Sequence, residues 1–236
     1  NIDDVAKVFD STPGNVVVPN TDLKPETVTS FDLGLTWTPS ERVQWEVSGF
    51  YSILNYMMVK APFEINGEDS IFYDGELSKV EAIQNLGNGF IYGFQTTLRA
   101  SLSQRFTLKG SLVYTQGEDG NGDPLRHVTP LFGAAHIEYL DKHVRVDLNI
   151  GSSGEISNAN LAPSELDKPY LYAKDEGGNP FSPSWTLINL NASWFISNSV
   201  RLVVGVDNIF DKRYRGYSSG ISGPGRNFLA SIVVHF

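Results

Sequence analysis

The sequence predicts an all-β fold, namely an antiparallel up-and-down transmembrane β-barrel of which this chain supplies about nine C-terminal strands. Three observations support this prediction: apolar and polar residues alternate with a period of two, short and long connections alternate along the chain, and aromatic residues gather near the expected strand ends. In a strand such alternation sorts the side chains onto two faces, whereas in a helix it would scatter them around the axis.

The alternation is clearest in residues 144–150, where four aliphatic residues at even positions are separated by Arg145, Asp147 and Asn149. Eight other segments have the same period, and no segment has a convincing helical one. In chain order, the nine expected strands are residues 29–37, 43–53, 91–102, 106–115, 131–139, 144–150, 188–194, 200–207 and 228–236.

The connections between these segments alternate between short and long without exception. The short ones lie at residues 38–41, 103–104, 141–142 and 197–198, and the long ones at 61–79, 117–129, 152–184 and 210–225. Transmembrane barrels have short periplasmic turns and longer extracellular loops, which explains such a pattern. The loops of a soluble β-sandwich follow topology and function, and have no reason to alternate.

Aromatic and charged residues fit the same arrangement. Phe106 and Tyr114 lie on one face eight residues apart, which in a tilted strand is roughly 20 Å along the membrane normal, close to the height of the apolar band of a barrel. Charged residues of the expected strands fall on the opposite face, where water or a plug would solvate them. An arginine or lysine on the lipid face would cost about 2–4 kcal/mol at mid-bilayer.

The composition excludes several classes of function. The chain has 18 basic and 27 acidic residues, a net charge of −9, which argues against a nucleic-acid partner because such a partner needs a basic surface. The absence of cysteine excludes disulfides, thiolate metal sites and thiol nucleophiles. The sequence also lacks a G-x-S-x-G nucleophile motif and a histidine pair at metal-binding spacing, so neither an enzyme nor a cofactor is expected.

The chain is expected to be part of a longer protein. It has no run of 18 apolar residues and no leader peptide at its start, so any export signal would lie outside it. Nine is an odd number of strands, whereas single-chain bacterial barrels have even numbers, and an open edge in lipid would leave backbone groups unpaired. We therefore expect residues 1–26 to end a preceding extracellular loop and residues 27–236 to form the C-terminal part of the barrel.

Four motifs, in this order, resemble those of TonB-dependent outer-membrane receptors. They are Leu23-Lys24-Pro25-Glu26 with Ser30 and Asp32-Leu33-Gly34; the group Asn85, Gly87, Ile91, Gly93 and Gln95; Asn208-Ile209-Phe210-Asp211-Lys212-Arg213-Tyr214; and Gly223-Pro224-Gly225-Arg226. The terminal Phe236 also resembles the signal by which outer-membrane proteins are recognised for assembly. The sequence departs from the family pattern at Asp32, Gly89 and Gln95, which stand in place of Glu, Ala and Glu.

The resemblance implies a 22-stranded barrel in the outer membrane of a Gram-negative bacterium. It further implies a plug domain that is not in this chain, a segment before the plug that contacts TonB, and energy-coupled import of a scarce nutrient such as a ferric siderophore, haem or cobalamin. The implied partners are the rest of the barrel, its plug, TonB, outer-membrane lipid and a small nutrient ligand.

The long connections supply candidate ligand-binding residues at the extracellular mouth. Aromatic rings beside an arginine can stack on a planar or chelated ligand, although aromatics at a membrane interface need no ligand. Three candidates, Tyr56, Met57 and Met58, are expected to end a strand at the mouth. Three more, Tyr170, Tyr172 and Trp185, flank the longest connection, and Tyr214, Arg215 and Tyr217 lie in the last connection, which is basic. Asp119, Asn121 and Asp123 alternate like the start of a calcium loop, but Pro124 stands where an EF-hand has glycine, so a flexible polar loop is preferred and no metal site is predicted.

Two other functions remain open at this stage. A passive porin-type channel would have the same strands but no plug. A soluble β-sandwich binding module would bury residues such as Val146, Leu148 and Ile150 against a second sheet.

Overall fold

The computed structural model describes residues 8–12, 14–166 and 168–235, which form mostly antiparallel strands with few helical turns. The strands are β1 (Phe9–Thr12), β2 (Asn15–Val18), β3 (Thr27–Ser40), β4 (Val43–Pro62), β5 (Ser70–Tyr73), β6 (Glu76–Ser101), β7 (Phe106–Asp119), β8 (Phe132–Leu140), β9 (Val144–Ser153), β10 (Ala173–Lys174), β11 (Pro180–Phe181), β12 (Trp185–Phe195), β13 (Val200–Asp207) and β14 (Asn227–Val234). The helical turns are η1 (Asn158–Asn160), α2 (Pro163–Leu166) and η2 (Pro169–Leu171). Among the described residues, no helix has the length and apolar character needed to cross a membrane.

The chain forms two compact units. The first contains residues up to 30 together with 52–91 and 118–122, and the second contains 31–51, 92–117 and 123–236. Each of the nine expected strands is present as β3, β4, β6, β7, β8, β9, β12, β13 and β14. These strands are neighbours in one sheet in that order, with β3 beside β4 and β4 beside β6, so the predicted up-and-down topology is confirmed.

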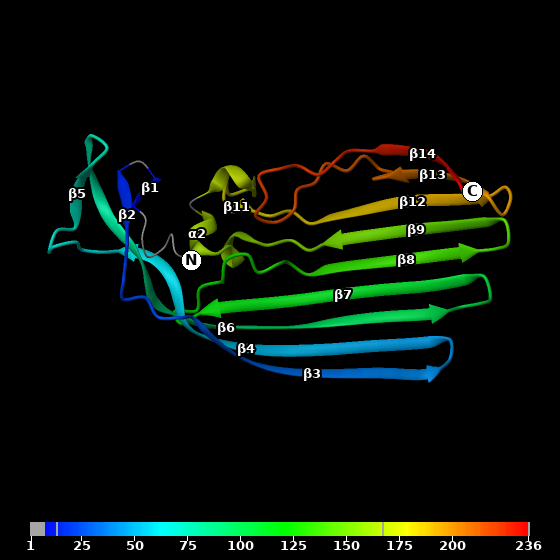
Figure 1. Ribbon diagram of the computed structural model, residues 1–236, viewed down its shortest axis with the longest axis horizontal. Coiled ribbons are helices and arrows are strands. Elements are labelled where there is room, and N and C mark those ends of the chain that lie inside the picture. The colour runs from blue at the N-terminus through cyan, green and yellow to red at the C-terminus, as the bar shows by residue number, and fades with distance from the viewer. Residues whose placement is uncertain (1–7, 13, 167, 236) are drawn as a thin grey trace. The chain divides into compact units, whose positions relative to one another are not determined.

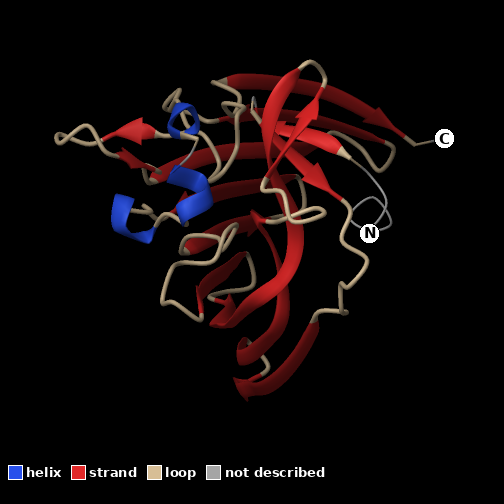
Figure 2. Cartoon of the chain, turned by 90° about the vertical axis from the view of Figure 1, so that its left-hand side faces the viewer, coloured by secondary structure: helices blue, strands red, loops and turns tan. Residues whose placement is uncertain are grey.

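In the second unit, the short turns lie together at one end of the strands (Figure 1). Residues 41–42, 102–105, 141–143 and 196–199 form these turns, and β14 ends at the same side. The longer connections of this unit, 154–184 and 208–226, lie at the opposite end, where Figure 2 shows the helical turns among the loops. The predicted alternation of short and long connections is therefore present.

The strand register aligns the apolar residues into continuous rows. One row crosses six neighbouring strands, because each member is paired with the next by the hydrogen-bonded register. Its members are Leu108, Ile137, Leu148, Leu190, Val206 and Phe228. A one-residue slip in any pairing would move the apolar residues of that strand to the other face of the sheet. Because the row is continuous over six strands, the apolar residues of all six lie on one face.

The opposite face of the same strands is polar and internally paired. Glu138 on β8 is the centre of a small network, since its Oε2 lies 2.5 Å from Arg145 Nη2 and 4.0 Å from Lys109 Nζ. His136 is the neighbouring residue on the same face of β8, and its Nδ1 lies 3.6 Å from Asp147 Oδ1. The charges that the sequence analysis assigned to the polar face in these strands are thus found there.

The β-sandwich alternative is wrong for this chain. The strands form one large sheet, and the only other sheet among the described residues is the two-stranded pair β10–β11. None of Val146, Leu148 and Ile150 is buried, and Ile232 on the same face is 69% exposed. An exposed, continuous apolar face on a long antiparallel sheet matches a wall against lipid rather than one layer of a soluble core.

Aromatic pairs mark the strand ends. Trp37 and Trp45, on either side of the β3–β4 turn, meet edge to face with ring centroids 6.2 Å apart. Phe106 and Tyr139 pair at 5.0 Å beside the β6–β7 and β8–β9 turns. Both pairs lie beside short turns, in agreement with the prediction that aromatic residues gather near the strand ends.

The first unit has a small core of its own that the sequence analysis did not predict. Val16 and Val18 of β2 are buried against Val80 and Ala82 of β6, and β2 pairs parallel with β6. Partly buried residues pack around this core, namely Phe63, Ile65, Ile71 and Tyr73. Strands β4 and β6 are therefore longer than expected, and β5 occupies part of the expected loop 61–79.

The C-terminal strand begins one residue earlier than expected and ends at Val234. The predicted terminal position, Phe236, lies outside the described residues.

Candidate functional site

The long connections of the second unit enclose a pocket of about 370 Å³, which we call the aromatic–basic pocket. Its volume lies in the range of small-molecule sites. The connections 154–184 and 208–226 provide its lining, together with the start of β12. It is lined by Tyr170, Leu171, Tyr172, Ala173, Ser182, Pro183, Ser184, Trp185, Lys212, Arg213, Tyr214, Arg215, Gly216 and Ser222.

The structure brings together most of the candidates predicted in this unit. Tyr170, Tyr172, Trp185, Tyr214 and Arg215 all line the aromatic–basic pocket. The ring of Tyr217, the sixth candidate, stands 6.3 Å from that of Tyr172, so it supports the wall instead of lining it.

A group of side-chain-to-backbone hydrogen bonds at the start of the 208–226 connection stabilises this side of the pocket. The buried Asn208 has a positive φ of 49°, and its amide nitrogen donates to the carbonyls of Lys212 at 2.9 Å and Pro224 at 3.1 Å. The Asp211 carboxylate accepts from the backbone N–H of Arg226 at 2.8 Å. The third and fourth motifs are therefore joined by side-chain-to-backbone bonds, which satisfy otherwise unpaired loop groups.

Glycine at position 223 leaves room for the ring of Tyr214, which a larger residue would displace. A Cβ built on Gly223 would overlap that ring, and the Gly223 N–H donates to the Tyr214 carbonyl at 2.9 Å. The Tyr214 ring in turn packs on Trp185 with centroids 5.0 Å apart. The motif glycine thus lets one strand-end turn deliver an aromatic side chain into the pocket.

Trp185 lies on the polar face of the sheet. Its register partner is Ser153, which also pairs with Phe132, and Phe132 contacts Trp185 edge to face at 6.2 Å. The apolar row runs through Leu148 and Leu190, an odd number of residues away from Ser153 and Trp185, so these aromatics face away from it. For Trp185, a role as a lipid-interface aromatic is therefore excluded.

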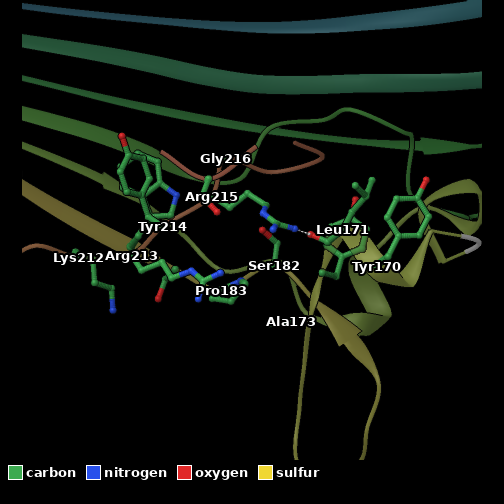
Figure 3. Close-up of a pocket in the computed structure, with 14 residues that line it drawn as sticks. Tyr170, Leu171, Ala173, Ser182, Pro183, Lys212, Arg213, Tyr214, Arg215 and Gly216 are labelled. Atoms are coloured by element: carbon green, nitrogen blue, oxygen red, sulfur yellow. Dashed lines mark hydrogen bonds between the residues drawn. The ribbon is translucent and has the colours of Figure 1, made fainter. Parts of the chain in front are cut away.

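The cations of the pocket come from one short segment. Arg215 extends across the pocket, and its Nη1 donates to the Leu171 carbonyl at 2.9 Å (Figure 3). Lys212 and Arg213 are exposed, and neither side chain forms an ion pair with any described residue. Three cations beside four aromatic rings favour an anionic ligand with planar groups.

A buried carboxylate stands behind the pocket wall. Glu165 of α2 has no exposed surface, and it accepts hydrogen bonds from Arg126 Nε at 2.6 Å, from Ser218 Oγ at 3.0 Å and from the Tyr172 hydroxyl. His127 Nε2 lies 3.5 Å from the same carboxylate. Such a set of donors is what a buried charge requires.

These contacts explain the perturbed acidities. Burial raises the pKa of the Glu165 carboxyl, but hydrogen bonds from Tyr172, Arg126 and Ser218 outweigh burial and hold that pKa below its usual value. Burial, followed by the hydrogen bond to Glu165, raises the pKa of Tyr172 well above its usual range. Burial and the Glu165 charge also raise the pKa of Tyr217. The carboxylate is thus ionised and both tyrosines are neutral at physiological pH.

The remaining predicted ligand residues lie in the first unit. Tyr56, Met57 and Met58 are in the interior of β4 and do not end a strand, which corrects the sequence-based placement. The longer strand follows from its pairing with β6. Asn85 of the second motif donates to the Tyr56 carbonyl at 2.7 Å, and Glu26 of the first accepts from the Met58 N–H at 2.5 Å. These motif residues fix the backbone of the three candidates.

The weak calcium candidates are explained in part by a turn. The Asp119 carboxylate accepts from the Asn121 N–H at 2.8 Å, and the Asp119 carbonyl accepts from Gly122 at 3.0 Å. Among the described residues, no group of three or more His, Cys, Asp or Glu side chains is arranged to hold a metal ion.

Sequence reasoning missed Phe132, Lys212, Arg213 and the whole Glu165 cluster as parts of the site. For Phe132 a signal existed, because it is out of phase with the apolar set of its own strand. For Glu165 there was none, since its burial depends on three connections that are distant in sequence.

Comparison with known proteins gives a consistent result. A family model described as "TonB dependent receptor-like, beta-barrel" matches residues 2–209. The iron-regulated outer membrane virulence protein of Vibrio cholerae serotype O1 is 20% identical over 94% of this chain and 33% of its own length.

Solved structures resemble the fold. The siderophore receptor PirA from Acinetobacter baumannii matches with a TM-score of 0.71 and 21% identity over 94% of this chain and 33% of that one. A variant of the ferric enterobactin receptor PfeA from Pseudomonas aeruginosa, in complex with enterobactin, matches with a TM-score of 0.72 and 17% identity over 93% and 33%. The chain spans about a third of the length of these proteins.

Proposed function

Because the chain belongs to the family of TonB-dependent receptor-like β-barrels, we propose that it is part of an outer-membrane receptor for TonB-coupled active import of a scarce nutrient chelate. Proteins of this family reside in the outer membrane of Gram-negative bacteria, and the similar protein PirA is a siderophore receptor, which supports a receptor and not an enzyme. The proposed partners are the rest of the barrel, its plug, TonB, lipid and the chelate.

The aromatic–basic pocket carries the proposal of ligand binding. It lies among the long connections, which in such barrels face the extracellular side. Its rings and cations suit an anionic chelate with planar groups, a description that fits haem as well as a ferric siderophore with aromatic groups. Within the classes of ferric siderophore, haem and cobalamin we favour ferric siderophore. The names of the related receptors support the same class.

Growth on defined nutrients tests this proposal. A strain that lacks the full-length gene is compared with its parent on ferric enterobactin, on haem as sole iron source, or on limiting cobalamin. We expect the mutant to lose growth on one ferric siderophore or related chelate, and inactivation of TonB to have the same effect as the deletion. Uptake of that chelate that persists without TonB would instead identify a passive channel.

A further inference from the structure

We propose that Glu165 is the anchor of a clamp that holds three connections of the second unit in one arrangement and thereby sets the shape of the aromatic–basic pocket. The three connections are those between β7 and β8, between β9 and β12, and between β13 and β14. Each provides a partner within hydrogen-bonding distance of this one carboxylate. Glu165 is a positioning residue in this account, because it acts through Tyr172 and does not line the pocket itself.

Each connection makes a different contact. From the β7–β8 connection, Arg126 Nε donates to Oε1 at 2.6 Å, and His127 lies 3.5 Å from the same oxygen. From the β13–β14 connection, Ser218 Oγ donates to Oε2 at 3.0 Å. The carboxylate's own connection contributes the Tyr172 hydroxyl. Three hydrogen-bond donors therefore converge on Glu165, and the most distant of them, Ser218, lies 53 residues from it in the sequence.

Tyr172 and Arg215 connect the clamp to the aromatic–basic pocket. Tyr172 lines the pocket while its hydroxyl donates to Glu165, and its ring packs against Tyr217 from the β13–β14 connection. A second tie joins the same two connections, since Arg215 donates to the Leu171 carbonyl. Movement of the β13–β14 connection would therefore separate Lys212, Arg213 and Arg215 from the tyrosines opposite them.

Removal of the charge should loosen all three connections at once. A buried carboxylate with several donors is favourable only as a complete set. Glutamine at this position keeps one acceptor oxygen but replaces the other with an amide donor, which then faces either Arg126 or the hydroxyls of Tyr172 and Ser218. The ion pair between Arg126 and Glu165 should stabilise the clamp less than a fully buried pair would, because the Arg126 side chain is 46% exposed and water screens its charge. Local opening, and not unfolding of the strands, is the expected response, since the clamp lies outside the sheet.

Hydrogen–deuterium exchange on the purified full-length receptor tests the clamp without any ligand. In Glu165→Gln we expect amides in residues 124–130, 169–173 and 214–221 to exchange about tenfold faster or more, with β8, β9 and β12 unchanged. Glu176→Gln is the matched control, because Glu176 is an exposed carboxylate on the same β9–β12 connection. Arg126→Gln, at a half-exposed position, should accelerate the same three segments less.

The outcomes separate the alternatives. Faster exchange in all three segments of Glu165→Gln, but not of Glu176→Gln, supports the clamp. Faster exchange confined to residues 169–173, or equal in the two variants, overturns it. Should Glu165→Gln not reach the membrane, Arg126→Gln decides alone by the same criterion. The inference rests on the proposed function only for the role of the pocket, so a receptor that imports nothing would leave this exchange result unaffected.

Discussion

Leu148→Arg should strongly reduce the amount of folded full-length receptor in the outer membrane, whereas Asn149→Arg should be tolerated. Leu148 is in the middle of the apolar row, between Ile137 and Leu190 in register. An arginine on the lipid face near mid-bilayer costs about 2–4 kcal/mol. The neighbouring Asn149 lies on the polar face, where its amide nitrogen is 3.1 Å from His136 Nδ1, and an arginine there can reach water.

The measurement is the heat-modifiable migration of the receptor from outer-membrane fractions on gels, with total expression determined in parallel. The two variants introduce the same side chain at adjacent positions, so differences in synthesis or export cancel. Equal amounts of folded protein in both would contradict the assignment of the two faces.

Arg213→Glu should weaken binding of the imported chelate by about tenfold or more, which corresponds to about 1.4 kcal/mol. Arg213 lines the aromatic–basic pocket beside Lys212 and Arg215, and the reversal replaces an attraction for an anionic ligand with a repulsion. Binding is measured with the chelate identified by the growth test, on cells that carry the full-length receptor.

Lys142→Glu provides the control for this charge reversal. Lys142 is exposed in the short turn between β8 and β9, at the opposite end of the strands from the pocket. Ions screen exposed charges beyond about 8 Å at physiological ionic strength, so this variant should bind normally. The effect of Arg213→Glu should also shrink as salt rises. Normal binding by Arg213→Glu would remove the pocket from the ligand path.

The strands of the sheet could be predicted because their signal is local. Alternation in residues 144–150 fixes both the strand and its faces, and the register adds only which residues meet. The third and fourth motifs were recognised from the sequence as well, but only the structure explains why these residues are needed. Asn208 and Asp211 hydrogen-bond to the backbone of Pro224 and Arg226 and so join the two ends of their connection.

The small core of the first unit could not be found in the same way. Val16, Val17 and Val18 form a continuous apolar run that does not alternate, and all three are buried. They pair in parallel with Val80, Glu81 and Ala82 of β6, across a long stretch of sequence. A criterion based on a period of two excludes such a strand, because both of its faces are covered.

The site was only partly predictable for a related reason. Aromatic residues such as Tyr172 and Tyr214 were identifiable by type and by their position in long connections. The burial of Glu165 depends on Arg126 and Ser218, which belong to two other connections. No local pattern around residue 165 distinguishes it from the exposed acids of the same loops.

Accessibility of single spin labels along β9 tests the central assignment most directly. This chain contains no cysteine, so once any cysteine elsewhere in the full-length receptor has been replaced, labels can be introduced one at a time at positions 146 to 150 and studied in lipid bilayers. We predict that labels at 146, 148 and 150 collide with oxygen dissolved in lipid, and that those at 147 and 149 collide with a water-soluble nickel chelate. Uniform accessibility along these positions, or the opposite phase, would contradict the account.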